Sequence, residues 1–142
     1  MADVRVNHIS SILVANRGEI ARRVMRTAHD MGIRTIAVFA DGDAEAPFVR
    51  EADSAYSLSG RTSAETYLNV KKILEICEKS SATAVHPGYG FLSENADFAQ
   101  AVIGNGTIWI GPSPDVIASM GDKLSAKTLM QEVGVPTLPA IK

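Results

Sequence analysis

Short apolar runs alternate with amphipathic segments along the chain, and this alternation predicts both strands and helices. The first run, which ends in Ile-Leu-Val-Ala, is apolar on both faces, as a buried parallel strand is. The predicted strands are Ile9–Ala15, Ile33–Ala40, Ser54–Leu58, Thr83–His86 and Thr107–Ile110. The predicted helices are Glu19–Met31, Pro47–Glu51, Asn69–Lys79, Glu94–Ile103, Asp115–Met120 and Leu124–Val133.

The strict order of strand and helix predicts the fold class. It is α/β, a doubly wound parallel sheet with helices on both faces and a Rossmann-like connectivity. Residues 1–112 are expected to form this α/β domain. Residues 113–142 hold no predicted strand, so we expect a helical segment that leads towards a second domain.

The first predicted helix is amphipathic. Its apolar positions recur at spacings of four and three and predict one buried stripe, formed by Ile20, Val24, Ala28 and Met31. Its charged positions fall largely on the other side and are Arg22, Arg23, Arg26 and Asp30. On spacing alone, these charges describe a solvated helix face.

Composition and charge exclude several classes of protein. Hydrophobic residues make up 46% of the 142 residues and charged residues 21%, which is typical of a globular domain and excludes disorder. A net charge of −2 gives no field that would attract nucleic acid or an anionic membrane. The one cysteine, Cys77, is expected to be a small core residue and fits a reducing compartment. Since no signal peptide, transit peptide or membrane span is evident, we expect a cytoplasmic protein, or one imported with its leader removed.

Two unusual segments follow predicted strands. Asn16–Glu19 follows the first strand, and the glycine-rich segment His86–Asn95 (HPGYGFLSEN) follows the fourth. Ligands of open α/β sheets bind beyond the carboxyl ends of the strands, so both loops are candidates for a binding site. The first turn has only Gly18 and is no dinucleotide fingerprint, and the phosphate-binding P-loop motif does not occur. A simple NAD enzyme is therefore disfavoured.

Three long motifs resemble the biotin carboxylase family. Ile12–Ala21 (ILVANRGEIA) is similar to the opening of these enzymes, and HPGYGFLSEN to their loop after the fourth strand. Ile110–Lys123 (IGPSPDVIASMGDK) resembles the passage that leaves their first domain. The resemblance extends over nearly all of the chain from about Ile9 to Lys142.

The resemblance implies an ATP-dependent ligase. Such enzymes use ATP to phosphorylate bicarbonate to carboxyphosphate, which yields CO2 for the ureido nitrogen of biotin, with magnesium bridging the phosphates. The biotin is attached to a carrier protein or domain, and a carboxyltransferase passes the carboxyl group on to an acyl-CoA or a keto acid. The resemblance further implies that residues 113–142 lead into an ATP-grasp domain.

Individual residues match positions of the family. Lys123 matches a lysine that contacts ATP phosphate, which suits a point positive charge, although most lysines are simply solvated. Tyr89 and Gly90 match positions close to biotin: a tyrosine offers a ring face and a hydroxyl, and a glycine lets a ligand approach the backbone. Tyr89 could instead cap the sheet.

Supporting and interface positions are also implied. His86, Glu94 and Asn95 accompany the loop, and His86 is expected to be a hydrogen-bonded structural histidine rather than a proton carrier. Arg23, Arg26 and Asp30 match the family's dimer interface on the first helix, which would make the protein a homodimer. No second histidine, cysteine or carboxylate stands at ligand spacing, so we expect no metal site within this chain.

The family's general base, bicarbonate-binding arginine and magnesium ligands have no counterpart in these 142 residues. We therefore expect no catalytic residue within the chain and no turnover by the chain alone. Two other hypotheses stay open from the sequence. One is a non-catalytic module that binds a partner or dimerises, and the other is the first domain of a different ATP-grasp ligase.

Overall fold

The computed structural model describes residues 8–121 and 130–135. The strands are Ser11–Val14 (β1), Arg34–Phe39 (β2), Ser54–Ser57 (β3), Ala84–His86 (β4) and Ile108–Trp109 (β5). The helices are Gly18–Asp30 (α1), Pro47–Glu51 (α2), Val70–Ser80 (α3), Ala96–Gly104 (α4) and Pro114–Gly121 (α5), with a 3-10 turn at Asp41–Asp43 (η1). Every predicted strand lies within a residue or two of its expected position.

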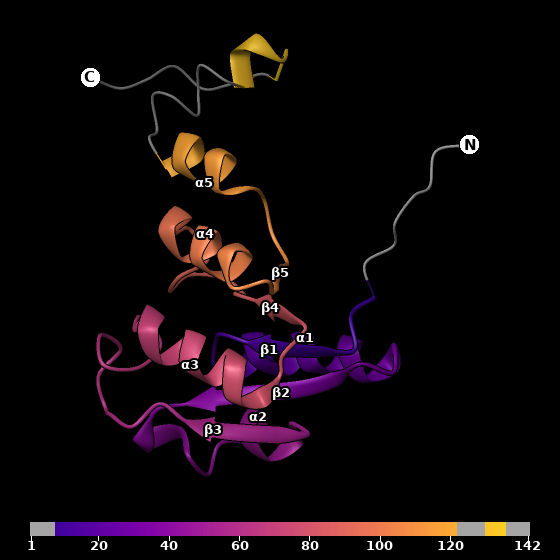
Figure 1. Ribbon diagram of the computed structural model, residues 1–142, viewed down its shortest axis with the longest axis vertical. Coiled ribbons are helices and arrows are strands. Elements are labelled where there is room, and N and C mark those ends of the chain that lie inside the picture. The colour runs from indigo at the N-terminus through magenta and orange to yellow at the C-terminus, as the bar shows by residue number, and fades with distance from the viewer. Residues whose placement is uncertain (1–7, 122–129, 136–142) are drawn as a thin grey trace.

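The strands form one parallel sheet in the order β3-β2-β1-β4-β5 (Figure 1). From β1 the chain builds outwards through β2 to β3, then returns to the other side of β1 and builds outwards through β4 to β5. In register, Val14 of β1 lies between Ala37 of β2 and His86 of β4. The predicted doubly wound parallel α/β fold is confirmed, and its topological switch point lies between β1 and β4.

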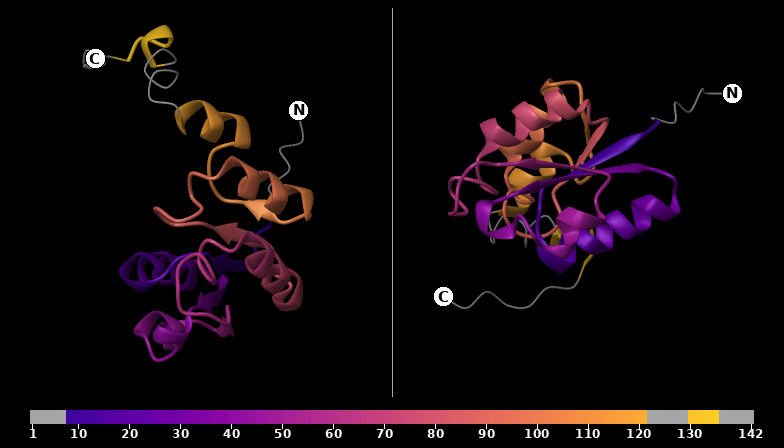
Figure 2. Two further views of the ribbon diagram at one scale, coloured as in Figure 1. Left: turned by 90° about the vertical axis from the view of Figure 1, so that its left-hand side faces the viewer. Right: turned by 90° about the horizontal axis from the view of Figure 1, so that it is seen from below.

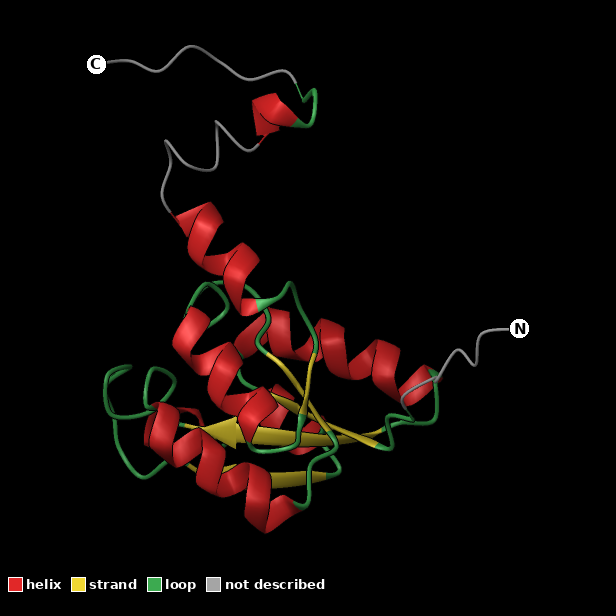
Figure 3. Ribbon diagram, turned by 45° about the horizontal axis from the view of Figure 1, so that its top comes forward, coloured by secondary structure: helices red, strands yellow, loops and turns green. Residues whose placement is uncertain are grey.

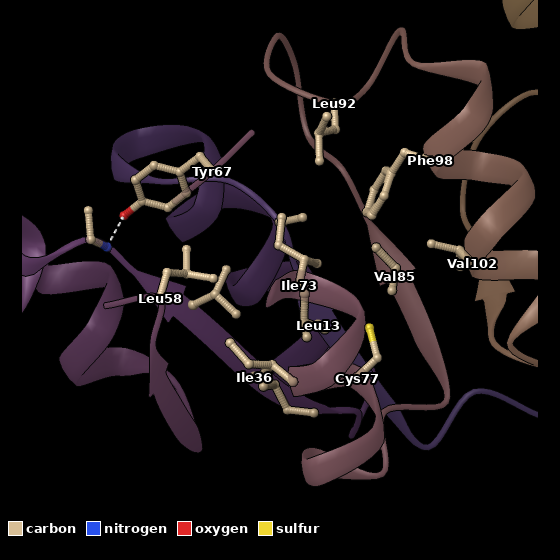
Figure 4. Packing of buried hydrophobic residues seen from close by; sticks show 14 residues of the cluster. Leu13, Ile36, Leu58, Tyr67, Ile73, Cys77, Val85, Leu92, Phe98 and Val102 are labelled. Carbon is tan, nitrogen blue, oxygen red and sulfur yellow. Dashed lines mark hydrogen bonds between the residues drawn. The ribbon is translucent and has the colours of Figure 1, made fainter. Parts of the chain in front are cut away.

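Helices cover both faces of the sheet, and alternation along β1 divides the core between them (Figure 2). Leu13 and Ala15 point to the face that α3 and α4 cover, whereas Ile12 and Val14 point to the face of α1 and α2. Figure 4 shows the first of these clusters, whose buried members include Leu13, Ile36, Leu58, Ile73, Cys77, Val85 and Phe98. Cys77 is 2% exposed, so its expected core position is confirmed, and burial raises the pKa of its thiol to about 11.

The buried stripe of α1 agrees with the prediction at Ala28 and differs from it at the other positions. The residues that face the sheet are Ala21, Met25 and Ala28, whereas Met31 is 69% exposed. The two small alanines let the helix lie close to the strands, and Met25 fills the space beside Phe48 of α2. Ile20 and Val24, predicted to be buried, lie at the margin of this contact and are only partly covered.

Helix ends follow their capping residues. α4 begins at Ala96 rather than at the predicted Glu94, because the Asn95 backbone is extended and its side chain accepts a hydrogen bond from the Phe98 amide (2.9 Å).

α5 begins at Pro114 and packs on α4, and Figure 3 shows this helix leading away from the sheet. The predicted helix Leu124–Val133 lies mostly outside the described residues.

Candidate functional site

The two loops singled out in the sequence meet at the switch point of the sheet. Asn16 follows β1, and His86 ends β4, the neighbouring strand. The backbone amide of Ala15 donates to the carbonyl oxygen of His86 (2.9 Å), so the two strands stay paired up to the start of both loops. Parallel strands end at the same edge, which is why segments about 70 positions apart in the sequence become neighbours.

The side chain of Asn16 joins these loops. It is 1% exposed, and its Nδ2 donates to the carbonyl oxygens of Pro87 (2.9 Å) and Tyr89 (2.7 Å). Its Oδ1 accepts a hydrogen bond from the Arg17 amide (2.8 Å). Both ends of the side-chain amide are therefore used, and the conformation of one loop fixes that of the other.

The second loop needs glycine at two places for two different reasons. At Gly88 (φ +67°), a Cβ would lie 2.6 Å from Asn16 Nδ2 and 2.8 Å from Ile20 Cγ2, so any side chain would displace the joining amide. At Gly90 (φ +69°) a Cβ would meet no atom within 4 Å, so only the left-handed backbone favours glycine there. The space above Gly90 is thus open to a ligand.

Tyr89 projects from this loop. It is 76% exposed, so the alternative that it caps the sheet is wrong. Together with Gly90 and Glu19 it borders a hollow of about 410 Å³ between the loop and the N-terminus of α1. An exposed aromatic ring beside an open glycine backbone offers both a stacking face and a close approach to a flat, polar ring.

His86 has a structural role, as expected. Its Nδ1 accepts a hydrogen bond from the Gly88 amide (3.0 Å), which places the ring proton on Nε2. Burial lowers the pKa of His86 below its usual value. The ring is therefore neutral at pH 7 and helps to turn the chain at the end of β4.

A second network behind the loops was not predicted. Arg17 donates from two nitrogens to the Asp43 carboxylate (2.6 and 2.7 Å), and the Tyr67 hydroxyl donates to Asp43 Oδ2 (2.7 Å). The Tyr67 oxygen also accepts from the buried Ala40 amide (3.1 Å), a bond drawn in Figure 4. The Tyr67 ring packs against Phe91 of the glycine-rich loop at a centroid distance of 5.2 Å. Sequence patterns gave no signal that Asp43 and Tyr67 belong together, because the pairing depends on the order of the strands.

The pKa values of Asp43, Arg17 and Tyr67 are shifted in the directions that favour the hydrogen bonds of this network. The hydrogen bond from Arg17 lowers the pKa of Asp43, and the same bond raises the pKa of Arg17. Burial raises the pKa of Tyr67, and its bond to Asp43 adds to this effect. All three side chains keep their ordinary charge states at neutral pH, so the network is a support and not a proton carrier.

The remaining loop positions contribute in different ways. Glu94 is exposed. Asn95, as the N-cap of α4, has a structural function that its place in the motif did not reveal. Lys123, the residue expected to contact ATP phosphate, lies outside the described residues.

The charged residues of α1 divide into two groups. Arg22 forms a bidentate ion pair with Glu51 of α2 (2.7 and 2.9 Å). Arg23, Arg26 and Asp30 are exposed. The prediction placed Arg23 opposite the apolar residues of α1, but Arg23 borders an apolar groove of about 540 Å³ between α1 and the sheet. The apolar lining of this groove includes Ile9, Ile12, Ile20, Val24, Met31 and Ile110.

Neither a metal site nor a membrane-spanning helix is present among the described residues. Within residues 8–121 and 130–135, no three histidine, cysteine or acidic side chains stand close enough to hold a metal ion. None of the helices in that same part of the chain is long and apolar enough to cross a membrane.

Comparison with known proteins gives a family for this arrangement. Residues 8–117 match the family model described as the biotin carboxylase N-terminal domain. The chain belongs to the biotin carboxylase family. The matched range includes all five strands, the Asn16 loop and the glycine-rich loop of the biotin carboxylase N-terminal domain.

Relatives of this biotin carboxylase domain are longer proteins. The biotin-dependent acyl-coenzyme A carboxylase alpha3 subunit of Mycobacterium leprae is 55% identical over 139 residues, which are 98% of this chain and 23% of that protein. Biotin carboxylase 2 of Bacillus subtilis is 44% identical over 132 residues, 93% of this chain and 30% of that protein. The crystal structure of Kluyveromyces lactis urea carboxylase superposes with a TM-score of 0.89 at 45% identity, over 92% of this chain and 12% of that one. The chain thus spans at most 30% of the length of each of these proteins.

Proposed function

We propose that this chain is the N-terminal domain of an ATP-dependent biotin carboxylase and that it contributes the Tyr89–Gly90 loop to the biotin site. One observation carries the proposal: an exposed tyrosine and an open glycine stand at the switch point of the sheet, on a loop tied to β1 by a buried asparagine. Ligands of doubly wound sheets bind at this position. The motifs that carry the family resemblance form the same loops.

The loop fits a biotin ring in its chemistry. The ureido ring is flat, with polar edges, and the exposed face and hydroxyl of Tyr89 suit such a ring. Gly90 leaves room for backbone contact. We therefore assign Tyr89 and Gly90 as biotin-proximal residues, with His86, Glu94 and Asn95 as supporting positions of the loop.

For ATP, this chain is proposed to supply Lys123, which would bind phosphate as a point charge. The described residues offer no set of three side chains for magnesium, so we assign no step to that ion here. We divide the chain into an α/β domain at 1–112 and, at 113–142, a segment that leads to an ATP-grasp domain. Bicarbonate and most ATP contacts would then belong to parts of the enzyme beyond this chain.

The proposed partners are a biotin carboxyl carrier protein or domain and a carboxyltransferase. M. leprae and B. subtilis relatives are named as an acyl-coenzyme A carboxylase subunit and a biotin carboxylase, which supports such an assembly. We also propose a homodimer through α1, with Arg23, Arg26 and Asp30 at the interface, because all three charges are exposed and Arg23 borders an apolar groove. A cytoplasmic location is proposed from the free, buried Cys77.

The experiment is an ADP-release assay with the full enzyme that contains this domain, in the presence of bicarbonate, with and without free biotin. The 142-residue chain is assayed beside it. We expect biotin-stimulated ADP formation by the enzyme and none by the chain alone. An enzyme without biotin stimulation would contradict the proposal, and turnover by the chain alone would contradict the view that its chemistry needs further residues.

A second candidate is a non-catalytic dimerisation module. The apolar groove beside α1, bordered by Arg23 and the exposed Met31, favours it. The same assay discriminates the two, because such a module would dimerise without any biotin-dependent ATP cleavage in the protein that contains it.

A further inference from the structure

We infer that Asn16 is a positioning residue for the biotin site: its buried side-chain amide sets the orientation of the Tyr89–Gly90 peptide. This inference rests on the proposed function. Asn16 itself contacts no ligand in this account. It acts through the loop that it holds.

A single side chain holds the glycine-rich loop through long-range hydrogen bonds. In the described part of the chain, the hydrogen bonds that tie residues 87–91 to a distant segment come from Asn16 Nδ2, to the carbonyl oxygens of Pro87 and Tyr89. The other bonds of the loop are local, such as the one from the Ser93 amide to the carbonyl oxygen of Gly90 (2.9 Å). The position of the Tyr89 carbonyl therefore depends on one donor.

Peptide geometry determines which way the Gly90 amide points. No cis peptide bond occurs among the described residues, and in a planar trans peptide the N–H points opposite to the C=O. The Tyr89 carbonyl points inwards to Asn16, which is 1% exposed, so the Gly90 N–H must point outwards. Gly90 is exposed, and its N–H donates to no acceptor within the part of the chain that the structure describes. Asn16 thus presents a free backbone donor beside the Tyr89 ring.

The packing of Asn16 against Gly88 is close to its steric limit. A Cβ at Gly88 would lie 2.6 Å from Asn16 Nδ2 and 3.0 Å from Asn16 Cβ. Gly88 and Asn16 therefore occupy complementary space, and a change at either residue must move the other. The same loop can be disturbed from both sides by independent substitutions.

The test compares Asn16→Asp with wild type in the full enzyme. The carboxylate keeps an acceptor for the Arg17 amide but places an oxygen against the two carbonyls that need a donor. We expect the KM for free biotin to rise by about tenfold, the size of effect that loss of one hydrogen bond from the reoriented Gly90 N–H can produce, while the KM for ATP stays unchanged. Gly88→Ala should give the same selective rise. A merely structural role would lower the yield of folded enzyme without separating the two KM values.

The matched control is Asn69→Asp at the N-cap of α3, where an aspartate accepts the Lys72 amide as well as asparagine does. It should leave both KM values unchanged. If Asn16→Asp is not recovered folded, Asn16→Ala is tested instead, because it removes the amide without burying a charge. The criterion is again a rise in the KM for biotin with an unchanged KM for ATP. A biotin KM within about twofold of wild type in the folded Asn16 variant, or equal rises for biotin and ATP, would overturn the inference. Absence of biotin stimulation in the wild-type enzyme would instead contradict the proposed function.

Discussion

The hydrogen-bond network of Arg17, Asp43 and Tyr67 behind the loops depends on Tyr67. Its hydroxyl both donates to Asp43 and accepts from the buried Ala40 amide. In Tyr67→Phe that amide loses its partner and stays buried, so we expect the free energy of unfolding to fall by about 1–3 kcal/mol. Urea denaturation of the chain measures this change.

Tyr56 provides the matched control. Among the described residues its hydroxyl forms no hydrogen bond, so Tyr56→Phe should change the free energy of unfolding by less than about 0.5 kcal/mol. Equal effects of the two substitutions would contradict the assigned role of Tyr67.

Asp43 gives the network a pH dependence. The hydrogen bond from Arg17 holds the pKa of Asp43 below its usual range. The ionised carboxylate therefore stabilises the fold above about pH 4, and this stabilisation is lost as the pH falls through the lower, folded pKa. Asp43→Asn should be less stable than wild type at pH 7 and should lose less further stability on acidification. Unfolding midpoints measured from pH 7 to pH 2 test this, with Asp41→Asn as the control; parallel curves for Asp43→Asn and wild type would rule the effect out.

Among the elements, α3 tests whether a helix end is set by its cap. The Asn69 side chain accepts from the Lys72 amide (3.1 Å), and Asn69→Ala removes this acceptor. We expect a loss of about 1 kcal/mol in the free energy of unfolding, whereas Asn69→Asp should stay close to wild type. If the alanine and aspartate variants were equally stable, the cap would not be the source of that stability.

Elements differ in how far the sequence could predict them. The strands were predicted well because short apolar runs between turns have few other solutions in an α/β chain. The stripe of α1 was predicted only in part. Ala28 is buried as predicted, but periodicity also favoured the large residues Ile20 and Met31, whereas the sheet contacts Ala21 and Met25. Which residues are buried depends on shape complementarity as well as on hydrophobicity. The shape of this contact depends on α2, which the hydrophobic pattern of α1 alone cannot reveal.

At the scale of the whole molecule, the strand order explains why the two loops meet. The sequence predicted only that Asn16–Glu19 and the glycine-rich loop both lie at the carboxyl edge of the sheet, and the pairing of β1 with β4 brings them together. The particular contacts were beyond the sequence. Neither the bond from Asn16 to Tyr89 nor the grouping of Arg17 with Tyr67 has any local signal, because each joins residues that only the strand order brings together.

The proposed dimer is also a whole-molecule property. Reversing two exposed charges of α1 in Arg23→Glu/Arg26→Glu should weaken dimerisation of the enzyme at least about tenfold, because like charges would then face each other across the interface. Sedimentation velocity over a range of concentrations measures this. Arg50→Glu on α2 is the control for charge reversal, and an unchanged dimer in the double variant would place the interface elsewhere.

The most direct test of the account is the rate of ADP formation by the full enzyme as a function of free biotin concentration, for wild type and for Tyr89→Ala. Tyr89 is exposed and outside the core, so its removal should leave the fold intact. We predict biotin-stimulated ATP cleavage in the wild type, and in the variant a biotin KM raised about tenfold with the KM for ATP unchanged. Two results would contradict the account: a wild-type enzyme whose rate of ADP formation does not depend on biotin, or a Tyr89→Ala variant with the wild-type KM for biotin.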